Sequence, residues 1–347
     1  MALLAGVLAV TVASGVLHYA DADPVAVFIV AAGALAGLAW VIAVATETVG
    51  DRFGPAATGV LQSTLGNLPE LFVVLFAISA GEIVVAKTSI VGSLLANALL
   101  VLGLAIVAGA RAAPDGVMKF KRRLPNDTAT LLLLAVFVLA VLAVSDQVGD
   151  RASRHQVAIS VIGAICLLAV YGGWLWSYLR SEAKEPVLEQ PQAHRHVSFN
   201  AAIVLLAAGG VAAALVSDWF VDALDPAVEA IGISKAFTGL VIVGIAGNAV
   251  ENVVGIMLAA KGQSDLAISV VKNSVAQIAV FLFPALVLLS LFFESRLTFV
   301  LAPVYVIALV LTALAVWQIT GDGKAVVFEG FALVTLYVVV ATLAYYE

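Results

Sequence analysis

The chain has 347 residues, of which 63% are hydrophobic and only 12% are charged, whereas ordinary soluble domains hold roughly 25% charged residues. This composition excludes a water-soluble globular domain and indicates a protein that lies in a lipid bilayer. The formal net charge is −6, and we expect neither a nucleic-acid partner nor a cofactor. The single cysteine, Cys166, allows no disulfide and no cysteine metal site within one chain.

Eleven apolar runs are each close to the ~20 residues that a helix needs to cross a bilayer. They predict an all-α, polytopic membrane protein with about eleven transmembrane helices. The first run could instead be a cleaved signal peptide, although residues 1–4 lack the basic residues of such a peptide. The expected helices cover residues 2–18, 25–46, 55–80, 83–109, 127–145, 155–179, 198–217, 235–260, 265–292, 297–318 and 324–345.

Basic residues are unevenly placed between the predicted helices. If the amino terminus lies inside, the inner connections hold eleven Lys and Arg residues and the outer ones hold four, besides Lys87 at a helix end. One outer connection is instead acidic, with Asp218, Asp222, Asp225 and Glu229. Since basic residues favour the inner side, we expect a cytoplasmic amino terminus and an outer carboxyl terminus, in a prokaryotic inner membrane.

Two short motifs lie 181 positions apart. Residues 66–70 read Gly-Asn-Leu-Pro-Glu and residues 247–251 read Gly-Asn-Ala-Val-Glu, and the same offset joins Ser93 to Ser274. This duplication predicts two five-helix units, and because five crossings reverse direction, the second unit is inverted. Inverted units place a substrate site at mid-membrane, where they meet. The expected boundaries are 1–24 for an extra amino-terminal helix, 25–180 for the first unit, 181–197 for a cytoplasmic linker and 198–347 for the second unit.

Other acidic features are expected to lie outside that site. The linker 181–197 contains three spaced glutamates, which suit a solvated connector, with a cytoplasmic cation sensor as the alternative. Glu329 lies near the inner end of the last predicted helix, so we expect it to be an interfacial charge.

Each motif places a carboxylate, Glu70 or Glu251, within an apolar run. A charged side chain at mid-bilayer costs roughly 2.5 to 3.5 kcal/mol on insertion scales, so such a pair is functional by default. The next predicted helix of each unit carries further polar side chains, and for Ser89 a simple helix-joining role stays open. Oxygen ligands alone suit a hard cation such as Ca²⁺ or Na⁺. The further polar residues are Ser89, Ser93 and Asn97, followed in the second unit by Asn273, Ser274 and Gln277.

The backbone at the motifs is expected to be irregular. Pro69 lacks an amide hydrogen, so the carbonyl of Leu65 beside Gly66 loses its helical partner. A freed carbonyl at membrane depth can line a cavity or coordinate an ion, and a simple proline kink is the alternative. Gly244 and Gly247 can loosen the second motif, which lacks the proline.

The two motifs resemble the paired repeat signatures of the calcium/cation antiporter superfamily, and they are closest to its cation/proton exchanger branch. The resemblance implies a secondary antiporter in which Glu70 and Glu251 bind the cation and exchange it for protons. The residues that it would place around the ion are Asn67, Asn248, Ser93, Asn97, Ser274 and Gln277. The similarity rests on residues 66–71, 89–97, 102–103, 247–251, 277–279 and 284.

Three positions depart from that branch and are possible modulators of the site. Asn252 stands where a histidine is usual, and Asn273 where a glycine is usual. Lys272 would cancel one negative charge if it reached the glutamates, favouring a monovalent ion or an internal lysine–glutamate switch. Helical geometry puts Lys272 about 160° around the axis from Ser274, so we expect its side chain to snorkel towards the cytoplasm.

The proton carriers are expected to be the carboxylates, because none of the four histidines lies mid-helix near the motifs. A carboxylate does not hold a proton and a cation together, so the two should compete. We therefore expect a cation/proton antiporter that exchanges Ca²⁺ for H⁺ by alternating access. The alternative is a Na⁺(K⁺)/H⁺ antiporter of the same fold. A cation channel is a distant alternative because it needs a continuous pore, and hydrolase motifs are absent.

Overall fold

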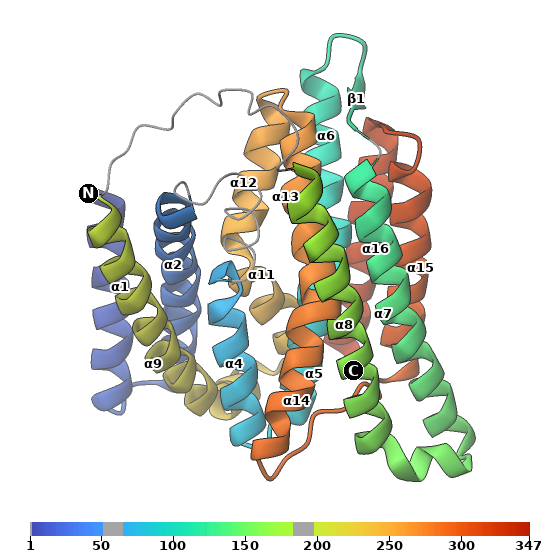
Figure 1. Ribbon diagram of the computed structural model, residues 1–347. Coiled ribbons are helices and arrows are strands. Elements are labelled where there is room, and N and C mark those ends of the chain that lie inside the picture. The colour runs from blue at the N-terminus through green and yellow to red at the C-terminus, as the bar shows by residue number, and fades with distance from the viewer. Residues whose placement is uncertain (1, 51–64, 122, 183–197) are drawn as a thin grey trace.

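The computed structural model describes residues 2–50, 65–121, 123–182 and 198–347. Most of these residues are helical, and Figure 1 shows the long helices side by side in a bundle, as expected of an all-α membrane protein. The predicted linker 181–197 lies almost wholly outside the described residues, so its two interpretations stay open.

The part of the chain up to residue 182 contains one long interrupted helix. A π-helical segment, η1 (Ala96–Val101), joins α5 to α6, so that Ile83–Ala112 is a continuous span. A short 3-10 segment, η2 (Arg151–His155), precedes α8. The helices of this part are α1 (Ala2–Tyr19), α2 (Pro24–Gly50), α4 (Leu68–Ser79), α5 (Ile83–Leu95), α6 (Leu102–Ala112), α7 (Arg123–Val148) and α8 (Gln156–Glu182).

The part of the chain after residue 197 also contains long helices that are interrupted by π-helical segments. Two further π-helical segments, η3 (Thr238–Val243) and η4 (Ile278–Leu282), lie within its spans, and the 3-10 segment η5 (Ser290–Phe292) ends one of them. The α-helices are α9 (Phe199–Ile231), α10 (Lys235–Phe237), α11 (Gly244–Gly247), α12 (Ala249–Ala260), α13 (Ser264–Gln277), α14 (Phe283–Leu289), α15 (Pro303–Thr320) and α16 (Val327–Tyr346).

The lengths and apolar sequences of these helices make the chain an integral, multi-pass membrane protein. Within the described ranges, eight helices are long and apolar enough to cross a bilayer, and a bent pair, Lys235–Gly247 with Asn252–Ala260, raises the number to nine. Two shorter apolar helices, Leu3–Tyr19 and Leu68–Ser79, cover two further predicted ranges. The expected count of eleven crossings therefore stays a prediction.

One edge of the bundle is formed by α1, α2 and α9, which lie together in Figure 1. Phe28 of α2 stacks on Phe220 of α9 with ring centroids 4.7 Å apart. The inner faces of α2 and α9 contact α4 and the α11–α12 region, which carry the two motifs. The motifs therefore lie between this three-helix edge and the rest of the bundle.

Glycines bring the central helices unusually close. A Cβ atom at Gly92 of α5 would lie 2.2 Å from the carbonyl oxygen of Leu240 in η3, and one at Gly244 would lie 2.7 Å from the carbonyl carbon of Gly92. No larger side chain fits at these distances without moving backbone. The contact fixes α5, from the first part of the chain, directly against the helix that leads to the second motif.

A small antiparallel ribbon is a departure from the all-α expectation. Strand β1 (Val117–Lys119) pairs with β2 (Lys324–Val326), with Met118 opposite Ala325. Just after β1, the amide of Lys121 donates to Asp265 Oδ1 over 2.7 Å. The hydrogen bond from Lys119 holds the pKa of the exposed Asp115 carboxyl below its usual value. The ribbon joins the α6–α7 connection to the α15–α16 connection at one end of the bundle.

Candidate functional site

Both motifs interrupt a helix at their asparagine. Asn67 has φ −84° and ψ 7°, and α4 begins directly after it. Asn248 has φ −108° and ψ 18°, and it separates α11 from α12. The helix axes on the two sides of the second break differ by 57°. The second break therefore forms without a proline.

Pro69 lies in the first turn of α4, where a helix tolerates a residue without an amide hydrogen. The chain has already left helical geometry at Asn67, so the proline follows the break. This is the place at which an irregular backbone was predicted. A role for the carbonyl of Leu65 or for Gly66 as an ion ligand stays a prediction.

A hydrogen-bonded pair joins the two parts of the chain at the motifs. Asn97 Nδ2, in the π-helical segment η1, donates to Asn248 Oδ1 over 2.9 Å and also reaches Ser274 Oγ at 3.4 Å. Asn248 Nδ2 in turn donates to the carbonyl of Gly244 over 3.0 Å. All three side chains are buried. Residues from both predicted units therefore meet in one polar centre.

The first motif carboxylate lies next to the second motif. Glu70 is completely buried, and a Cβ atom built on Gly247 would lie 3.5 Å from its Cβ. Glu70 is the third residue of α4, and Glu251 is the third residue of α12. A carboxylate in the first turn faces the positive end of the helix dipole. The side chain of Glu251 lies outside what the structure describes, so its approach to Glu70 stays a prediction.

Several neutral oxygens in this region are buried without a hydrogen bond from any described group. They are Ser93 Oγ, Asn97 Oδ1 and Gln277 Oε1, on side chains that are at most 3% exposed, although the Gln277 carboxamide also lies beside the Tyr171 hydroxyl. Buried polar atoms in native proteins nearly always have a partner. Carboxamide and hydroxyl oxygens are ligands that Ca²⁺ and other hard cations accept. The donor set therefore suits a cation better than an anion or a thiophilic metal.

Ser89 and Asn252 each donate to a backbone carbonyl. Ser89 Oγ donates to the carbonyl of Val85 in its own helix over 2.6 Å, so both the helix-joining role and a role at the ion stay predictions for this residue. Asn252 Nδ2 donates across the break to the carbonyl of Ile245 over 3.3 Å, so this residue holds the end of α11. Asn273 is partly buried, and its Oδ1 has no hydrogen bond to a described group.

The expectation that Lys272 snorkels into water is wrong. The residue is only 3% exposed, and its ammonium donates to Thr320 Oγ1 of α15 over 2.7 Å. Thr320 Oγ1 donates onward to the carbonyl of Val316. Helix α7 packs against α13 and Thr320 of α15 accepts from the ammonium, so the side chain is enclosed within the bundle. The direction is still away from Ser274, as the helical geometry required.

Glu329 and a pair of glycines contribute no side chain to the polar centre. Glu329 lies in the first turn of α16, and its Oε2 accepts a hydrogen bond from the amide of Val326 over 2.9 Å, as suits an interfacial charge. The close contact at Gly92 and Gly244 was not foreseen as part of the site. Both glycines lie within or next to the duplicated segments, which was the available signal.

A polar centre held between interrupted helices inside an apolar bundle defines a membrane transporter of the broken-helix class. The chain belongs to the sodium/calcium exchanger protein family, whose model matches residues 24–179 and 201–346. This membership confirms the family resemblance that the motifs indicated.

Named relatives and solved structures agree with the family. The Ca(2+)/H(+) antiporter ChaA of Bacillus subtilis is 30% identical, covering 98% of this chain and 96% of that protein. The Ca(2+)/H(+) antiporter of Aphanothece halophytica is 30% identical, covering 93% and 91%. The structure of native YfkE has a TM-score of 0.82 at 27% identity and covers 99% of both chains. The H+/Ca2+ exchanger CAX, with a TM-score of 0.76 at 15% identity over 97% of this chain and 86% of that one, supports the fold alone.

Proposed function

We propose that this protein is a secondary antiporter that exchanges Ca²⁺ for H⁺ at one site shared by two inverted units. The observation that carries the proposal is the contact of Asn97 with Asn248 and Ser274. It joins polar residues of both predicted units, and Gly247, the neighbour of Asn248, lies against the buried Glu70. The two antiporter relatives described above match this chain over more than nine tenths of their length, and their names support Ca²⁺ and H⁺ as the two exchanged ions.

The cation ligands in this proposal are oxygens from both units. Glu70 and Glu251 supply the negative charge, and Ser93, Asn97 and Gln277 supply the neutral oxygens that have no partner in the described structure. Asn67, Asn248 and Ser274 complete the surroundings. Ca²⁺ takes 6–8 oxygen ligands in flexible geometry, so a mixed set of this kind can hold it.

Protons and Ca²⁺ would compete for the same carboxylates. A protonated glutamate is neutral and stable in an apolar bundle, whereas the ionised form needs a cation. Release of Ca²⁺ on one side therefore follows protonation, and binding on the other side follows proton loss. Two glutamates can trade two protons for one Ca²⁺ without net charge movement.

Access would alternate by movement of one part of the bundle against another. The site lies between the edge formed by α1, α2 and α9 and the remaining helices, so a shift of this edge can open either end of the site. The two separate family matches, 24–179 and 201–346, support the division into units at 25–180 and 198–347. The basic connections favour a cytoplasmic amino terminus in a prokaryotic inner membrane.

Sodium is the competing ion. A lysine in the site would favour a monovalent cation, but the Lys272 ammonium donates to Thr320 Oγ1 of α15. The calcium proposal is tested with purified protein in liposomes under an imposed pH gradient, following Ca²⁺ and Na⁺ uptake separately. We expect Ca²⁺ uptake that depends on the gradient. Uptake of Na⁺ without any uptake of Ca²⁺ would contradict the calcium proposal and identify Na⁺ as the transported ion.

A further inference from the structure

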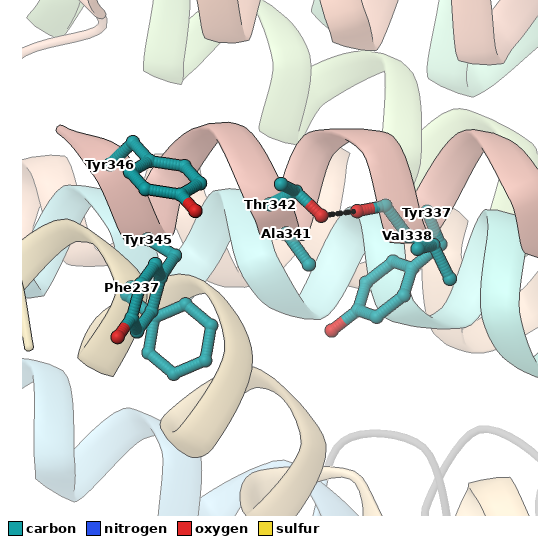
Figure 2. Close-up of a pocket in the computed structure, with 7 residues that line it drawn as sticks. All are labelled: Phe237, Tyr337, Val338, Ala341, Thr342, Tyr345 and Tyr346. Carbon is teal, nitrogen blue, oxygen red and sulfur yellow. Dashed lines mark hydrogen bonds between the residues drawn. The ribbon is translucent and has the colours of Figure 1, made fainter.

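A cavity that shares no lining residue with the polar centre lies between α10 and α16. Its volume is about 310 Å³, which is at the lower end of the size of small-molecule sites. Figure 2 shows its lining, with the Tyr337 ring at one end, the Phe237 and Tyr345 rings at the other and the small Ala341 between them. This groove is open along one side and lined almost entirely by carbon.

The groove faces lipid. Helix α16 is one of those long and apolar enough to cross the bilayer, and Val338, which lines the groove, is 53% exposed. At the helix end, Tyr345 and Tyr346 are 47% and 81% exposed, and tyrosines at this position are typical of the boundary between acyl chains and headgroups. The natural occupant of an apolar groove that opens at this depth is an acyl chain.

The walls of the groove are fixed rather than loose. Phe237 of α10 and Tyr345 pack edge to face with ring centroids 5.4 Å apart. Ser234 Oγ donates to the carbonyl of Ala344 over 2.6 Å, which ties the α9–α10 connection to the end of α16. One polar atom remains inside: the buried Tyr337 hydroxyl has no hydrogen-bond partner among the described groups, and it can donate to an oxygen of the occupant.

The charged side chains near the groove determine which lipid headgroup is favoured there. Lys235, two residues before Phe237, is held at 2.7 Å by both Glu82 and Asp225. Glu347, directly after Tyr346, accepts a hydrogen bond from Tyr305. Two carboxylates therefore contact the one ammonium group, and a third, Glu347, lies at the end of α16 beside the groove. An anionic headgroup would meet a surplus of negative charge, whereas a headgroup with a free amine would be attracted.

We propose that the groove lined by Phe237, Tyr337, Val338 and Tyr345 binds one acyl chain of a phospholipid with a primary-amine headgroup, such as phosphatidylethanolamine. The bound lipid contacts α10, which begins the span that leads to the second motif break at Asn248. It therefore braces the outer end of that span against α16. The site is independent of which cation the protein transports.

Two neighbouring valines give a matched test. Val338 lines the groove and Val339 does not, yet they are 53% and 59% exposed on the same helix. Native mass spectrometry of detergent-purified protein, with phosphatidylethanolamine or phosphatidylglycerol added at equal concentration, counts the lipids retained. We expect severalfold greater retention of phosphatidylethanolamine by the wild type and by Val339→Trp, and loss of that preference in Val338→Trp.

Melting curves of both variants establish that each is folded before the lipids are counted. Equal retention of the two lipids by the wild type would overturn the headgroup assignment. Equal retention of phosphatidylethanolamine by Val338→Trp and Val339→Trp would overturn the groove as its site. A change in the mass of the oligomer in Val338→Trp, without a change in bound lipid, would assign the groove to a second copy of the chain and overturn the proposal.

Discussion

Asn97 Nδ2 donates a hydrogen bond to Asn248 Oδ1 over 2.9 Å, across 151 positions of sequence. Neither side chain is exposed. One residue belongs to the helix that follows the first motif, and the other interrupts the helix of the second motif. Because this bond leaves Asn97 Oδ1 without a described partner, the pair orients one oxygen for a ligand.

The first prediction concerns the motif carboxylate. Glu70→Gln should reduce proton-driven Ca²⁺ uptake to background, because the neutral amide cannot alternate between a proton and a cation. Glu251→Gln should do the same. Uptake in liposomes is the measurement, and Glu329→Gln is the control, because that carboxylate lies in the first turn of α16 and should leave uptake unchanged. Full activity of Glu70→Gln would contradict the assignment of Glu70 to the cation site.

The second prediction separates two buried serines one helical turn apart. Ser93 Oγ has no described partner, whereas Ser89 Oγ donates to the carbonyl of Val85. Ser93→Ala should raise the Ca²⁺ concentration for half-maximal uptake about tenfold, which corresponds to about 1.4 kcal/mol and is the order of one hydrogen bond or ligand contact. Ser89→Ala should leave it within about twofold. Equal effects of the two changes would contradict the ligand role of Ser93.

The third prediction tests the close helix contact. Gly92→Ala places a Cβ atom 2.2 Å from the Leu240 carbonyl oxygen, so α5 and η3 must separate at a cost of roughly 1–3 kcal/mol. The variant should melt at a lower temperature in detergent and transport poorly. Gly172→Ala is the matched control, since nothing lies within 4 Å of a Cβ there. A melting temperature of Gly92→Ala equal to that of the wild type would show that α5 and η3 can separate without loss of stability.

The fourth prediction concerns the buried lysine. Lys272→Met should keep the ratio of Ca²⁺ to Na⁺ uptake unchanged, because the ammonium donates to Thr320 and points away from Ser274. Thr320→Val should lower the melting temperature by removing an acceptor from the ammonium. A changed ion ratio in Lys272→Met would place Lys272 at the ion site.

The duplicated motifs made the centre of the site predictable. A buried carboxylate beside Gly-Asn in two apolar runs needs no alignment to be noticed, and the helical period of Ser89, Ser93 and Asn97 put them on one face. The period could not tell which of these serine hydroxyls already has a hydrogen-bond partner in its own helix. That depends on whether a hydroxyl turns to its own backbone, as Ser89 does.

Features that depend on contacts between distant parts of the chain could not be predicted from the sequence. The snorkelling of Lys272 is the expected behaviour on a helix with one open side, but in the structure the side chain is buried and donates to Thr320 of α15. The ribbon of β1 and β2 was also missed, because three-residue strands in polar connections have no periodic pattern to detect. The break at Asn248 was underestimated, because only proline was treated as strong evidence for irregular backbone.

The most direct test of the shared site measures protons during ion binding. Ca²⁺ is titrated into the purified protein by calorimetry in two buffers that differ in ionisation enthalpy, so that proton release is read from the difference. We expect Ca²⁺ binding to release protons from the wild type and fewer protons, with weaker binding, from Glu70→Gln. Tight Ca²⁺ binding without proton release in the wild type would contradict competition between the cation and protons at these carboxylates.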